Sequence, residues 1–443
     1  MDDGGKPFDV ATFAKRFNHL SPEYGRNFKD IYKHMRAQCP MARSEELGGF
    51  WVATRYEDIM KIARDDATFA SRYGITITPS ANPDMPETLG PMGDKSTGPL
   101  AGIEPGPNGE TPRLITLPID LDPPFHRPYR RAIDQLFAPD AVVALEPWVV
   151  ALSHQLIDDI IETGEGDFSR DLGTPLTSIY TMKAAGLPLE DWSDYAYWMQ
   201  SQIAGSSSVQ PRTRGLTPTE LRERVAAEVV RQRTNPVEGG AIAHLMQADV
   251  DGHRLENWEI EAYIWLLIAG GVDTTQACMG SSFVWLSRNP ERRKELASNV
   301  ALMPHAIEEF LRVFAPQQAL SRTVMTDTEV AGQKLKRGDR VLMCWASGNM
   351  DEAEFEGAED VDFDRSNKRH MSFGLGMHRC LGSNVARLEF RVLFEHILQR
   401  MPDYRIHEEG LKPSPVSGVV FGYEHAPFSF TPGKKVGGPR LAV

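Results

Sequence analysis

Residues 257–288 constrain the fold most strongly, because apolar side chains surround the predicted helix almost completely. The run AYIWLLIAGGV, residues 262–272, leaves no polar face. A helix that is hydrophobic all round has to be buried by its neighbours. Asn257 is expected as its N-cap, with Glu259 and Glu261 in the positively polarised first turn. The segment therefore predicts a long, fully buried helix.

The same helix contains residues that oppose both helix formation and burial. Gly270 and Gly271 together cost about 2 kcal/mol relative to alanine. A buried carboxyl such as that of Asp273 costs more, unless it is paired or close to water. Taken alone, the pattern also fits a kinked helix whose aspartate forms a salt bridge. Its position in the middle of a buried helix makes it a candidate functional site.

The remaining periodicity predicts a mainly helical chain with a small β part. Helical spacing dominates the middle of the sequence, and a period near two follows it. The fold class is therefore mainly α with minor β, of the α+β type. The predicted helices lie at 55–64, 143–163, 219–233, 257–288 and 381–401, and the strands at 48–54 and 322–345, with turns at Gly332 and Gly338.

Four cysteines are present, and one of them has an unusual context. Cys39, Cys278 and Cys344 are scattered, which argues against a disulfide framework or a zinc site and predicts free thiols. Cys380 follows the glycine-rich run FGLGMHR, residues 373–379, and opens a predicted helix. A helix N-terminus stabilises a thiolate, the form of cysteine that binds metals. Without this context, Cys380 would be interpreted as an inert buried cysteine.

The string FGLGMHRCLG resembles the haem-binding loop FGxGxHxCxG of soluble bacterial cytochromes P450. The resemblance implies a haem b cofactor whose iron is bound by the thiolate of Cys380, which favours cleavage of the O–O bond. It also implies one triangular, mainly helical domain over residues 1–443. His378 is expected near a haem propionate, and Phe373, Gly374 and Gly382 are expected to contact the haem.

The string GGVDTT, residues 270–275, is similar to the AGxDTT signature of the same family, with Gly270 in place of its alanine. In that family the helix opens at this point to admit dioxygen and water. The resemblance implies that Thr274 forms a hydrogen bond to the bound oxygen and that Asp273 relays protons. An alcohol and an acid in a dry pocket can deliver the protons that oxygen cleavage requires.

Glu309 and Arg312 match the ExxR pattern of the family, although alone they would indicate a surface ion pair worth a few tenths of a kcal/mol. The third partner usually comes from an FDxxR string before the haem loop. Residues 362–365 keep DxxR, but Val361 replaces the phenylalanine. Arg365 is therefore the first candidate for the third partner, and His370 is the second.

Basic residues that match other family positions are expected around the haem. His126 and Arg130 lie four apart on one helix face and resemble the HxxxR pair that binds propionates, as does Arg322. Electrons would enter from the cysteine side, where cations could attract an acidic ferredoxin. The expected docking cations are Arg127, Arg131, Arg387 and Arg391, with Arg379 beside the cysteine.

The substrate pocket can be assigned only by resemblance, and two further regions remain open. A Pro/Gly-rich segment at 71–118 is either a linker or a partly ordered lid, to which Trp192, Tyr195, Tyr197 and Trp198 could contribute. Residues 1–20 and 433–443 are expected to be loose. The expected pocket residues are Leu266, Ala269, Gly270, Gln318, Ala319, Leu320 and Val420, all apolar but one.

Charge and composition exclude some functions. The net charge of -13 produces a surface that repels nucleic acid and anionic lipid. No apolar run approaches the roughly 18 residues that a membrane span requires, and no secretory signal is visible. We therefore expect a cytoplasmic monomer.

The sequence predicts a monooxygenase that inserts one atom of dioxygen into an apolar organic substrate, by hydroxylation or epoxidation. Its length matches a haem domain alone, so electrons from NAD(P)H are expected through a separate ferredoxin and its reductase. Two alternatives stay open, a peroxygenase and a haem-based sensor without turnover. The intact pair of Asp273 and Thr274 argues against a peroxygenase.

Overall fold

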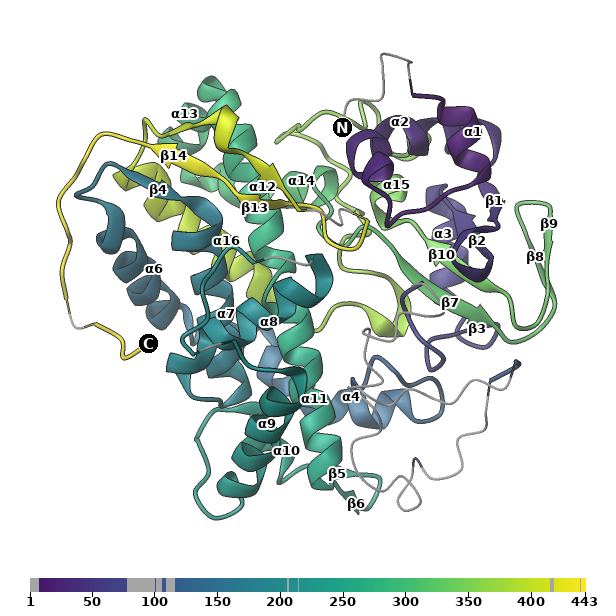
Figure 1. Cartoon of the computed structure of the whole chain (residues 1–443), viewed down its shortest axis with the longest axis horizontal. Helices are drawn as coiled ribbons and strands as arrows, with labels where there is room; N and C mark the ends of the chain where they lie inside the picture. Colours follow the sequence, from purple (N-terminus) through teal and green to yellow (C-terminus); the bar gives the residue numbers. More distant parts are fainter. Residues whose placement is uncertain are drawn as a thin grey trace.

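The computed structural model describes residues 8–77, 100, 106–108, 116–204, 207–213, 215–414, 418–438 and 440–443. Helices dominate, as Figure 1 shows. The α-helices are α1 (Val10–Lys15), α2 (Pro22–Gln38), α3 (Tyr56–Arg64), α4 (His126–Asp134), α5 (Pro139–Val143), α6 (Glu146–Ile160), α7 (Thr174–Ala185), α8 (Trp192–Ala204), α9 (Pro218–Gln232), α10 (Ala241–Leu245), α11 (Asn257–Gly271), α12 (Thr274–Arg288), α13 (Pro290–Ser298), α14 (Met303–Val313), α15 (Trp345–Asn349) and α16 (Ser383–Arg400).

The strands are short and form one main sheet with several small ones. The main sheet has the order β1-β2-β10-β7-β3, in which only the pairing of β10 with β2 is parallel. The strands are β1 (Met41–Ser44), β2 (Phe50–Ala53), β3 (Phe69–Ala70), β4 (Glu165–Asp167), β5 (Asp249–Val250), β6 (His253–Arg254), β7 (Leu320–Val324), β8 (Thr328–Val330), β9 (Gln333–Leu335), β10 (Arg340–Met343), β11 (Arg405–Ile406), β12 (Lys412–Pro413), β13 (Tyr423–His425) and β14 (Pro427–Ser429).

The main sheet lies to one side of a larger helical part, which contains most of the core (Figure 1). Helices α1, α2, α3 and α15 pack beside the sheet. A second buried cluster contains Phe17, between α1 and α2, and Tyr24 and Tyr32 of α2. The predicted class, mainly α with minor β, is confirmed.

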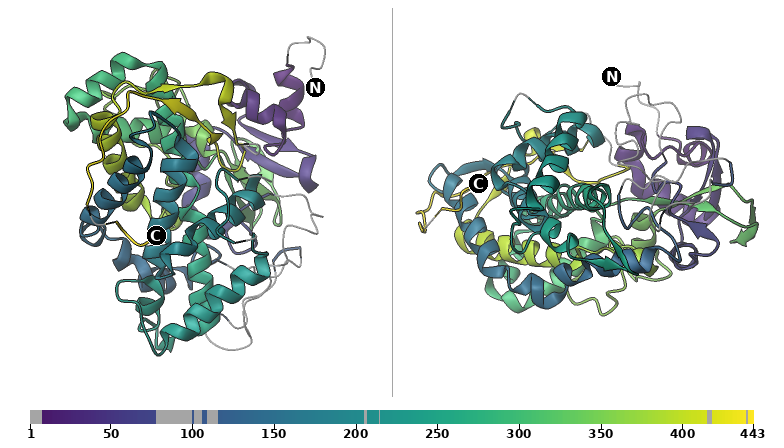
Figure 2. Two further views of the ribbon diagram at one scale, coloured as in Figure 1. Left: turned by 60° about the vertical axis from the view of Figure 1, so that its left-hand side comes forward. Right: turned by 90° about the horizontal axis from the view of Figure 1, so that it is seen from below.

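The predicted helix at 257–288 is interrupted in its middle. Helix α11 ends at Gly271 and α12 begins at Thr274. Helices α7, α8, α9 and α10 pack against α11, so that it runs through the interior (Figure 2). The expected N-cap was wrong, because Glu256 forms a capping box with Glu259, and Asn257 accepts a hydrogen bond from Arg233 instead.

Both chain ends differ from the loose termini that we expected. From residue 8 onward the N-terminal end is described, with α1 packed against α2 and Phe17 fully buried. The C-terminal tail is fastened to α6, because Asp158 accepts hydrogen bonds from the N–H groups of Val436 and Gly437, and Arg440 pairs with Asp159. Carboxylates on α6 thus provide partners that the tail sequence alone does not reveal.

Most of the expected lid, residues 78–99, 101–105 and 109–115, lies outside the described residues. Its described ends pack on the body of the protein: Ser71 is buried, and the N–H of Leu117 donates to Ala262 O at 3.2 Å. Tyr195 and Trp198 are buried on α8, where Trp198 contacts Trp265 of α11 with ring centroids 5.4 Å apart.

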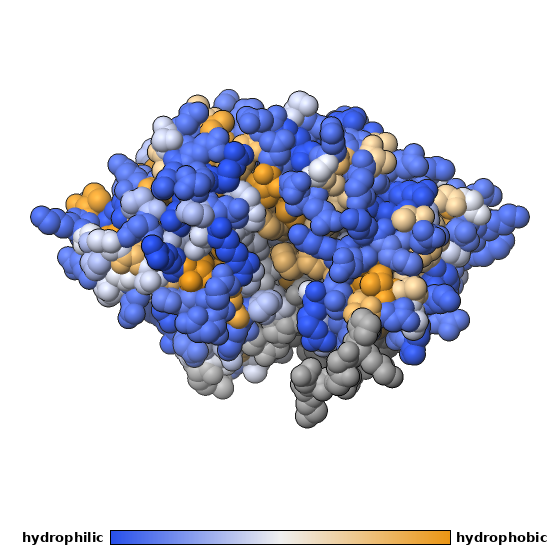
Figure 3. Space-filling model, turned by 90° about the horizontal axis from the view of Figure 1, so that it is seen from above, coloured by the Kyte–Doolittle hydropathy of each residue, from blue (hydrophilic) through white to orange (hydrophobic). Residues whose placement is uncertain are grey.

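The surface is hydrophilic over most of the face in Figure 3, with apolar side chains gathered mainly near its middle. Among the described residues, no single helix is long and apolar enough to cross a membrane. Only the pair His126–Val143 and Glu146–Ile160 meets that test by length and composition, across a bend of 71°.

Candidate active site

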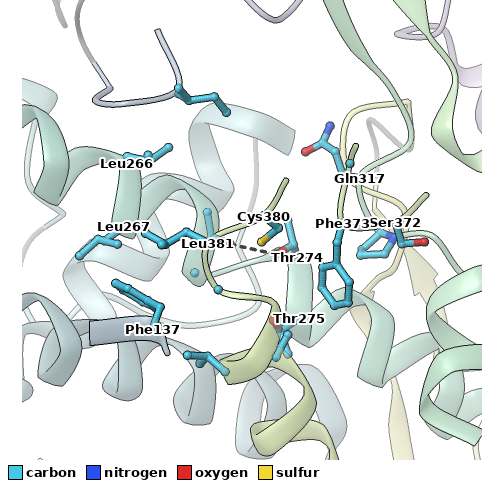
Figure 4. Close-up of a pocket in the computed structure, with 18 of the residues that line it drawn as sticks. Phe137, Leu266, Leu267, Thr274, Thr275, Gln317, Ser372, Phe373, Cys380 and Leu381 are labelled. Carbon is cyan, nitrogen blue, oxygen red and sulfur yellow. Dashed lines mark hydrogen bonds between the residues drawn. The ribbon is translucent and has the colours of Figure 1, made fainter. Parts of the chain in front are cut away.

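A large cavity separates the Cys380 loop from the break between α11 and α12 (Figure 4). With its open mouth it holds about 1520 Å3 free of protein atoms. That volume includes solvent at the mouth, and the residues that line the cavity come from both sides of the break and from the Cys380 loop.

The loop before α16 presents Cys380 to this cavity. Its N–H donates to Phe373 O at 2.7 Å, which closes the loop. Gly374 and Gly376 have φ angles of +64° and +71°, and a Cβ on Gly376 would lie 2.5 Å from Ala63 O. Side chains at these positions would strain or block the loop. Helix α16 begins only at Ser383, so Cys380 precedes the helix instead of opening it.

Opposing effects act on the thiol of Cys380. Desolvation by the surrounding protein raises the pKa of Cys380 overall, although the N–H of Gly382 and the guanidinium groups of Arg130, Arg379 and Arg387 oppose that rise. These cations and the N–H favour the anionic sulfur that binds a metal. Protein atoms crowd its thiol, yet Cys380 is the one exposed cysteine of the four because it opens onto the cavity, whereas Cys278, which also lines the cavity, is buried.

A cluster of hydrogen-bond donors lies at and behind another part of the cavity wall. His378 Nε2 lies 3.2 Å from Ser71 Oγ, which also accepts a hydrogen bond from Arg322, and the His126 ring is 4.3 Å from the His378 ring. Burial lowers the pKa of His126 to about 3 and that of His378 to about 4. Nδ1 of His378 is buried with no hydrogen-bond partner among the described residues. Such a site has donors to spare for an anionic ligand.

Asp273 and Thr274 lie at the break between α11 and α12 and face different surroundings. Thr274 lines the cavity and donates to Gly270 O at 2.9 Å, which leaves its oxygen free to accept a hydrogen bond (Figure 4). Asp273 is 5% exposed and does not line the cavity. Burial raises its pKa to about 6, against an opposing effect from the side chain of Gln200. The alcohol therefore reaches the cavity, and the acid lies behind it.

Helix α7 explains one of the two glycines at this break. A Cβ on Gly271 would lie 2.3 Å from Thr181 Oγ1, whereas a Cβ on Gly270 would meet nothing within 4 Å. Thr177, one turn earlier on α7, donates to Val272 O at 2.7 Å. This bond satisfies a carbonyl at the interruption.

Glu309, Arg312 and Arg365 form one buried cluster. Arg312 binds both oxygens of Glu309 at 3.0 Å, and Arg365 Nε binds Oε2 at 3.0 Å. Arg312 also donates to Asn349 O at 2.9 Å, which joins α14 to α15. The structure places Arg365, not His370, against Glu309, because His370 pairs with Glu308 at 3.1 Å.

Comparisons with known proteins agree with this geometry. A sequence model described as Cytochrome P450 matches residues 219–420. The steroid C26-monooxygenase of Mycobacterium tuberculosis H37Rv is 29% identical over 417 residues, which cover 93% of this chain and 96% of that protein. Cytochrome P450-terp of a Pseudomonas species is 27% identical over 416 residues, 90% of this chain and 92% of that protein.

Solved structures are similar over almost the whole chain. CYP109E1 from Bacillus megaterium in complex with testosterone has a TM-score of 0.76 at 26% identity and covers 93% of this chain and 99% of its own. CYP109Q5 from Chondromyces apiculatus has a TM-score of 0.79 at 25% identity, with 95% and 100% covered. The chain belongs to the cytochrome P450 superfamily. It is a haem-thiolate oxidoreductase with monooxygenase activity.

The residues of this cytochrome P450 fit haem. The loop around Cys380 holds this cysteine at the cavity surface, where an iron ligand has to lie. The orphaned Nδ1 of His378, which lines the cavity, suits a propionate carboxylate, whereas the buried guanidinium of Arg322 lies behind it on Ser71 and is not among the lining residues. A Cβ on Gly382 would meet no atom within 4 Å, so this position leaves open space at the cavity. His126, Arg130, Phe373 and Gly374 also line the cavity.

The structure changes the expected substrate pocket of this P450. Leu266, Gly270 and Leu320 line the cavity, but Ala269, Gln318, Ala319 and Val420 are not among the described lining residues. Gln318 points into the aromatic cluster instead, where it accepts a hydrogen bond from Tyr24 at 3.1 Å. The neighbouring Gln317 lines the cavity in its place. Further lining residues that we did not anticipate include Ile119, Phe137, Tyr180, Thr181, Ala184, Leu267 and Glu389.

The expected docking cations of this P450 divide into two groups. Arg127 and Arg131 on α4 are exposed and form no ion pair within the described residues. Arg387 instead binds Glu308 at 2.6 and 2.9 Å, and Arg391 binds Glu146 at 2.6 Å. These two arginines are held by carboxylates of neighbouring helices, so a partner would have to compete for them.

Two residues near the site were missed by sequence reasoning. Glu389 lines the cavity at 2% exposure, and its Oε1 has no hydrogen-bond partner among the described residues. Burial raises the pKa of Glu389 well above its usual value. The side chain of Gln200, on α8, opposes the rise in the pKa of Asp273. A glutamate amid the apolar stripes of α16 was a visible signal, whereas Gln200 gave none.

Proposed function

We propose that this P450 inserts oxygen into a neutral, largely apolar substrate of about steroid size. The carrying observation is the apolar wall of the cavity beside the break, formed by Leu266, Leu267, Phe137, Ala184 and Leu320. These side chains offer nothing that would pair with a charged substrate. Two similar proteins act on or bind steroids: the Mycobacterium relative is a steroid C26-monooxygenase, and CYP109E1 binds testosterone and corticosterone.

The proposed roles follow from where each side chain lies. Haem held by Cys380 supplies the iron that activates dioxygen. Thr274 accepts a hydrogen bond at the cavity surface, because its own proton is committed to Gly270 O. Asp273 holds the proton that is passed toward Thr274, because burial raises the pKa of its carboxyl toward neutral pH. His126, His378, Arg130 and Arg322 hold the propionates, and Glu309 with its two arginines braces the loops around the haem.

Electrons are proposed to come from NAD(P)H through a separate ferredoxin that docks on the face carrying Cys380. Arg127, Arg131 and Arg379 are exposed there. A hollow between α5, α14 and α16 is lined by apolar residues, among them Val142, Ile307 and Leu388, and by Arg387, Arg391 and Glu308. Cations around an apolar centre suit an acidic protein partner, and rim charges act mainly on the association rate.

We further propose that the chain works as one domain and as a monomer in the cytoplasm. Its main core cluster and the two smaller clusters share packed elements, since α15 contacts α2, α3 and α14. The four free cysteines suit a reducing compartment.

Turnover of a neutral steroid by the reconstituted system tests the proposal. With ferredoxin, its reductase, NADH and labelled dioxygen, one labelled oxygen atom should appear in testosterone or a related steroid. Cys380→His should abolish the thiolate spectrum of the reduced carbon monoxide complex, while Cys39→Ser should preserve it. Turnover with hydrogen peroxide alone would favour the peroxygenase, and a normal spectrum in Cys380→His would refute the ligand assignment.

A further inference from the structure

An arginine of α16 lies against the start of the Cys380 loop. The guanidinium carbon of Arg387 is 4.5 Å from the centroid of the Phe373 ring, a distance at which a cation and an aromatic face attract each other. Phe373 lines the cavity beside Cys380 (Figure 4), and its carbonyl accepts the N–H of Cys380 at 2.7 Å. One aromatic residue therefore connects a cation of α16 to the residue proposed to bind iron.

A carboxylate of α14 holds that arginine in place. Glu308 accepts hydrogen bonds from Nε and Nη2 of Arg387 at 2.6 and 2.9 Å, a bidentate pairing that fixes the plane of the guanidinium. Nη1 of the same arginine donates to Ser383 O at 3.1 Å. Glu308 also pairs with Nε2 of His370 at 3.1 Å, and the ring centroid of His370 lies 5.7 Å from that of Phe373. Glu308 therefore orients both basic side chains against the Phe373 ring.

The charges of this cluster partly cancel at neutral pH. Burial opposes ionisation of Glu308, but hydrogen bonds from Arg387 and His370 lower its pKa to about 2, so the carboxyl is an anion. The guanidinium of Arg387 in turn favours the anionic sulfur of Cys380. A carboxylate 2.6 Å from that cation weakens its effect on the sulfur.

We propose that Glu308 and Arg387 set the reduction potential of the haem, because the carboxylate holds the guanidinium against the Cys380 loop and offsets the positive charge that it brings there. Both are positioning residues, since neither is among the described residues that line the cavity. The proposal rests on the ligation of the iron by Cys380. Reduction transfers one electron from the ferredoxin, which is oxidised, to ferric iron, which becomes ferrous. This transfer adds one negative charge beside Cys380, and no bond forms or breaks. A nearby cation therefore favours the reduced state, and a nearby carboxylate disfavours it.

Substitutions of the two residues should shift the reduction potential in opposite directions. Glu308→Gln keeps the shape of the side chain and removes its charge. The uncompensated cation should then favour ferrous over ferric haem by about threefold to tenfold at a fixed ambient potential. Arg387→Met removes the cation and leaves the carboxylate, so ferrous haem should be disfavoured by about the same factor. The double variant Glu308→Gln/Arg387→Met removes both charges, and its potential should return toward that of the wild type.

The experiment is a dye-mediated redox titration of the haem-loaded protein, followed by its absorption spectrum. No ferredoxin is present, so docking does not enter the measurement. Glu146→Gln is the matched control, because Glu146 pairs with Arg391 at 2.6 Å, at a similar exposure but one turn further along α16. That variant should leave the midpoint potential unchanged. A general loosening of the fold cannot raise the midpoint in Glu308→Gln, lower it in Arg387→Met and restore it in the double variant.

Equal midpoints in the wild type, Glu308→Gln and Arg387→Met, or shifts of both variants in the same direction, would overturn the proposal. A shift in Glu146→Gln as large as that in Glu308→Gln would overturn it as well, since any charge along α16 would then suffice. If Arg387→Met does not bind haem, an unchanged or lowered midpoint in Glu308→Gln overturns the proposal alone. A normal carbon monoxide spectrum in Cys380→His would instead refute the ligation on which the proposal rests, even if the midpoints shift as expected.

Discussion

The two glycines at the end of α11 should respond oppositely to the same added methyl group. Gly270→Ala introduces a Cβ into open space, so the variant should gain up to about 1 kcal/mol of helix propensity. Gly271→Ala places its Cβ 2.3 Å from Thr181 Oγ1 and 3.3 Å from Thr181 Cγ2. Neither distance allows a normal contact, so α7 or α11 must move.

The change in the free energy of unfolding expected for Gly271→Ala follows from the groups that the added methyl displaces. Overpacking of a buried contact typically costs about 1–3 kcal/mol. The hydrogen bond from Thr181 Oγ1 to Thr177 O, at 2.8 Å, contributes about 1 kcal/mol that a displaced hydroxyl would lose. Against these stands the gain in helix propensity, so a net destabilisation of about 1–3 kcal/mol is expected.

Urea unfolding of both variants, followed by tryptophan fluorescence, measures this difference. Thr181→Ala removes the opposing atoms, so in the double variant with Gly271→Ala most of the loss should disappear. Such a double-mutant cycle should give a coupling of about 1–3 kcal/mol. Equal free energies of unfolding for Gly270→Ala and Gly271→Ala, or strictly additive effects of Gly271→Ala and Thr181→Ala, would show that contact with α7 is not the reason for glycine at position 271.

Three further predictions follow from buried and exposed charges. Glu389→Gln should stabilise the fold increasingly as pH rises above about 4.3, because the folded wild type keeps a proton on Glu389 that the unfolded chain releases. The free energy of unfolding at pH 5 and at pH 7.5 measures this effect. The same change at the exposed Glu223, Glu223→Gln, should show no such trend. Arg365→Ala leaves Glu309 underpaired and should cost about 3–5 kcal/mol with faster haem loss, measured by denaturation and by transfer of haem to an acceptor. The double variant Arg127→Glu/Arg131→Glu should slow reduction of this P450 by an acidic ferredoxin and flatten the salt dependence of that rate in stopped-flow experiments. An unchanged reduction rate at low salt would place the docking site elsewhere.

The parts of the site that the sequence predicts are those built from contiguous strings. The loop around Cys380 and the break at Gly271 depend on glycines and polar groups within a few residues, and local spacing determines them. The pair of Glu309 and Arg312 lies on one helix turn, so its contact is also local. Arg365 could be ranked first but not assigned, because more than fifty residues, including β7 to β10 and α15, separate it from Glu309 in the chain.

The residues that line the substrate side of the cavity could not be predicted, because they depend on which alternate residues of an extended segment face the cavity. Along an extended segment, alternate residues face opposite sides, so a one-residue difference exchanges the faces. Gln317 forms an isolated bridge with Val420 and faces the cavity, whereas Gln318 faces the aromatic cluster. Both are glutamines, and their sequence gives no reason to choose between them.

The break between α11 and α12 shows why a helix this apolar contains an acid. In an unbroken buried helix, Asp273 would bear the full cost of burial with nothing gained. The interruption frees backbone groups that Thr177 and Thr274 bind, so that Thr274 faces the cavity while Asp273 lies buried behind it. Locally unfavourable choices, two helical glycines and an incompletely paired carboxyl, thus coincide at the point where we propose that protons are delivered to the cavity. Sequences accept such violations chiefly at functional sites, where another interaction compensates for them. Here a compensating contact comes from Thr177 of α7, which is not among the lining residues, so its substitution should change the proposed proton delivery without touching the cavity.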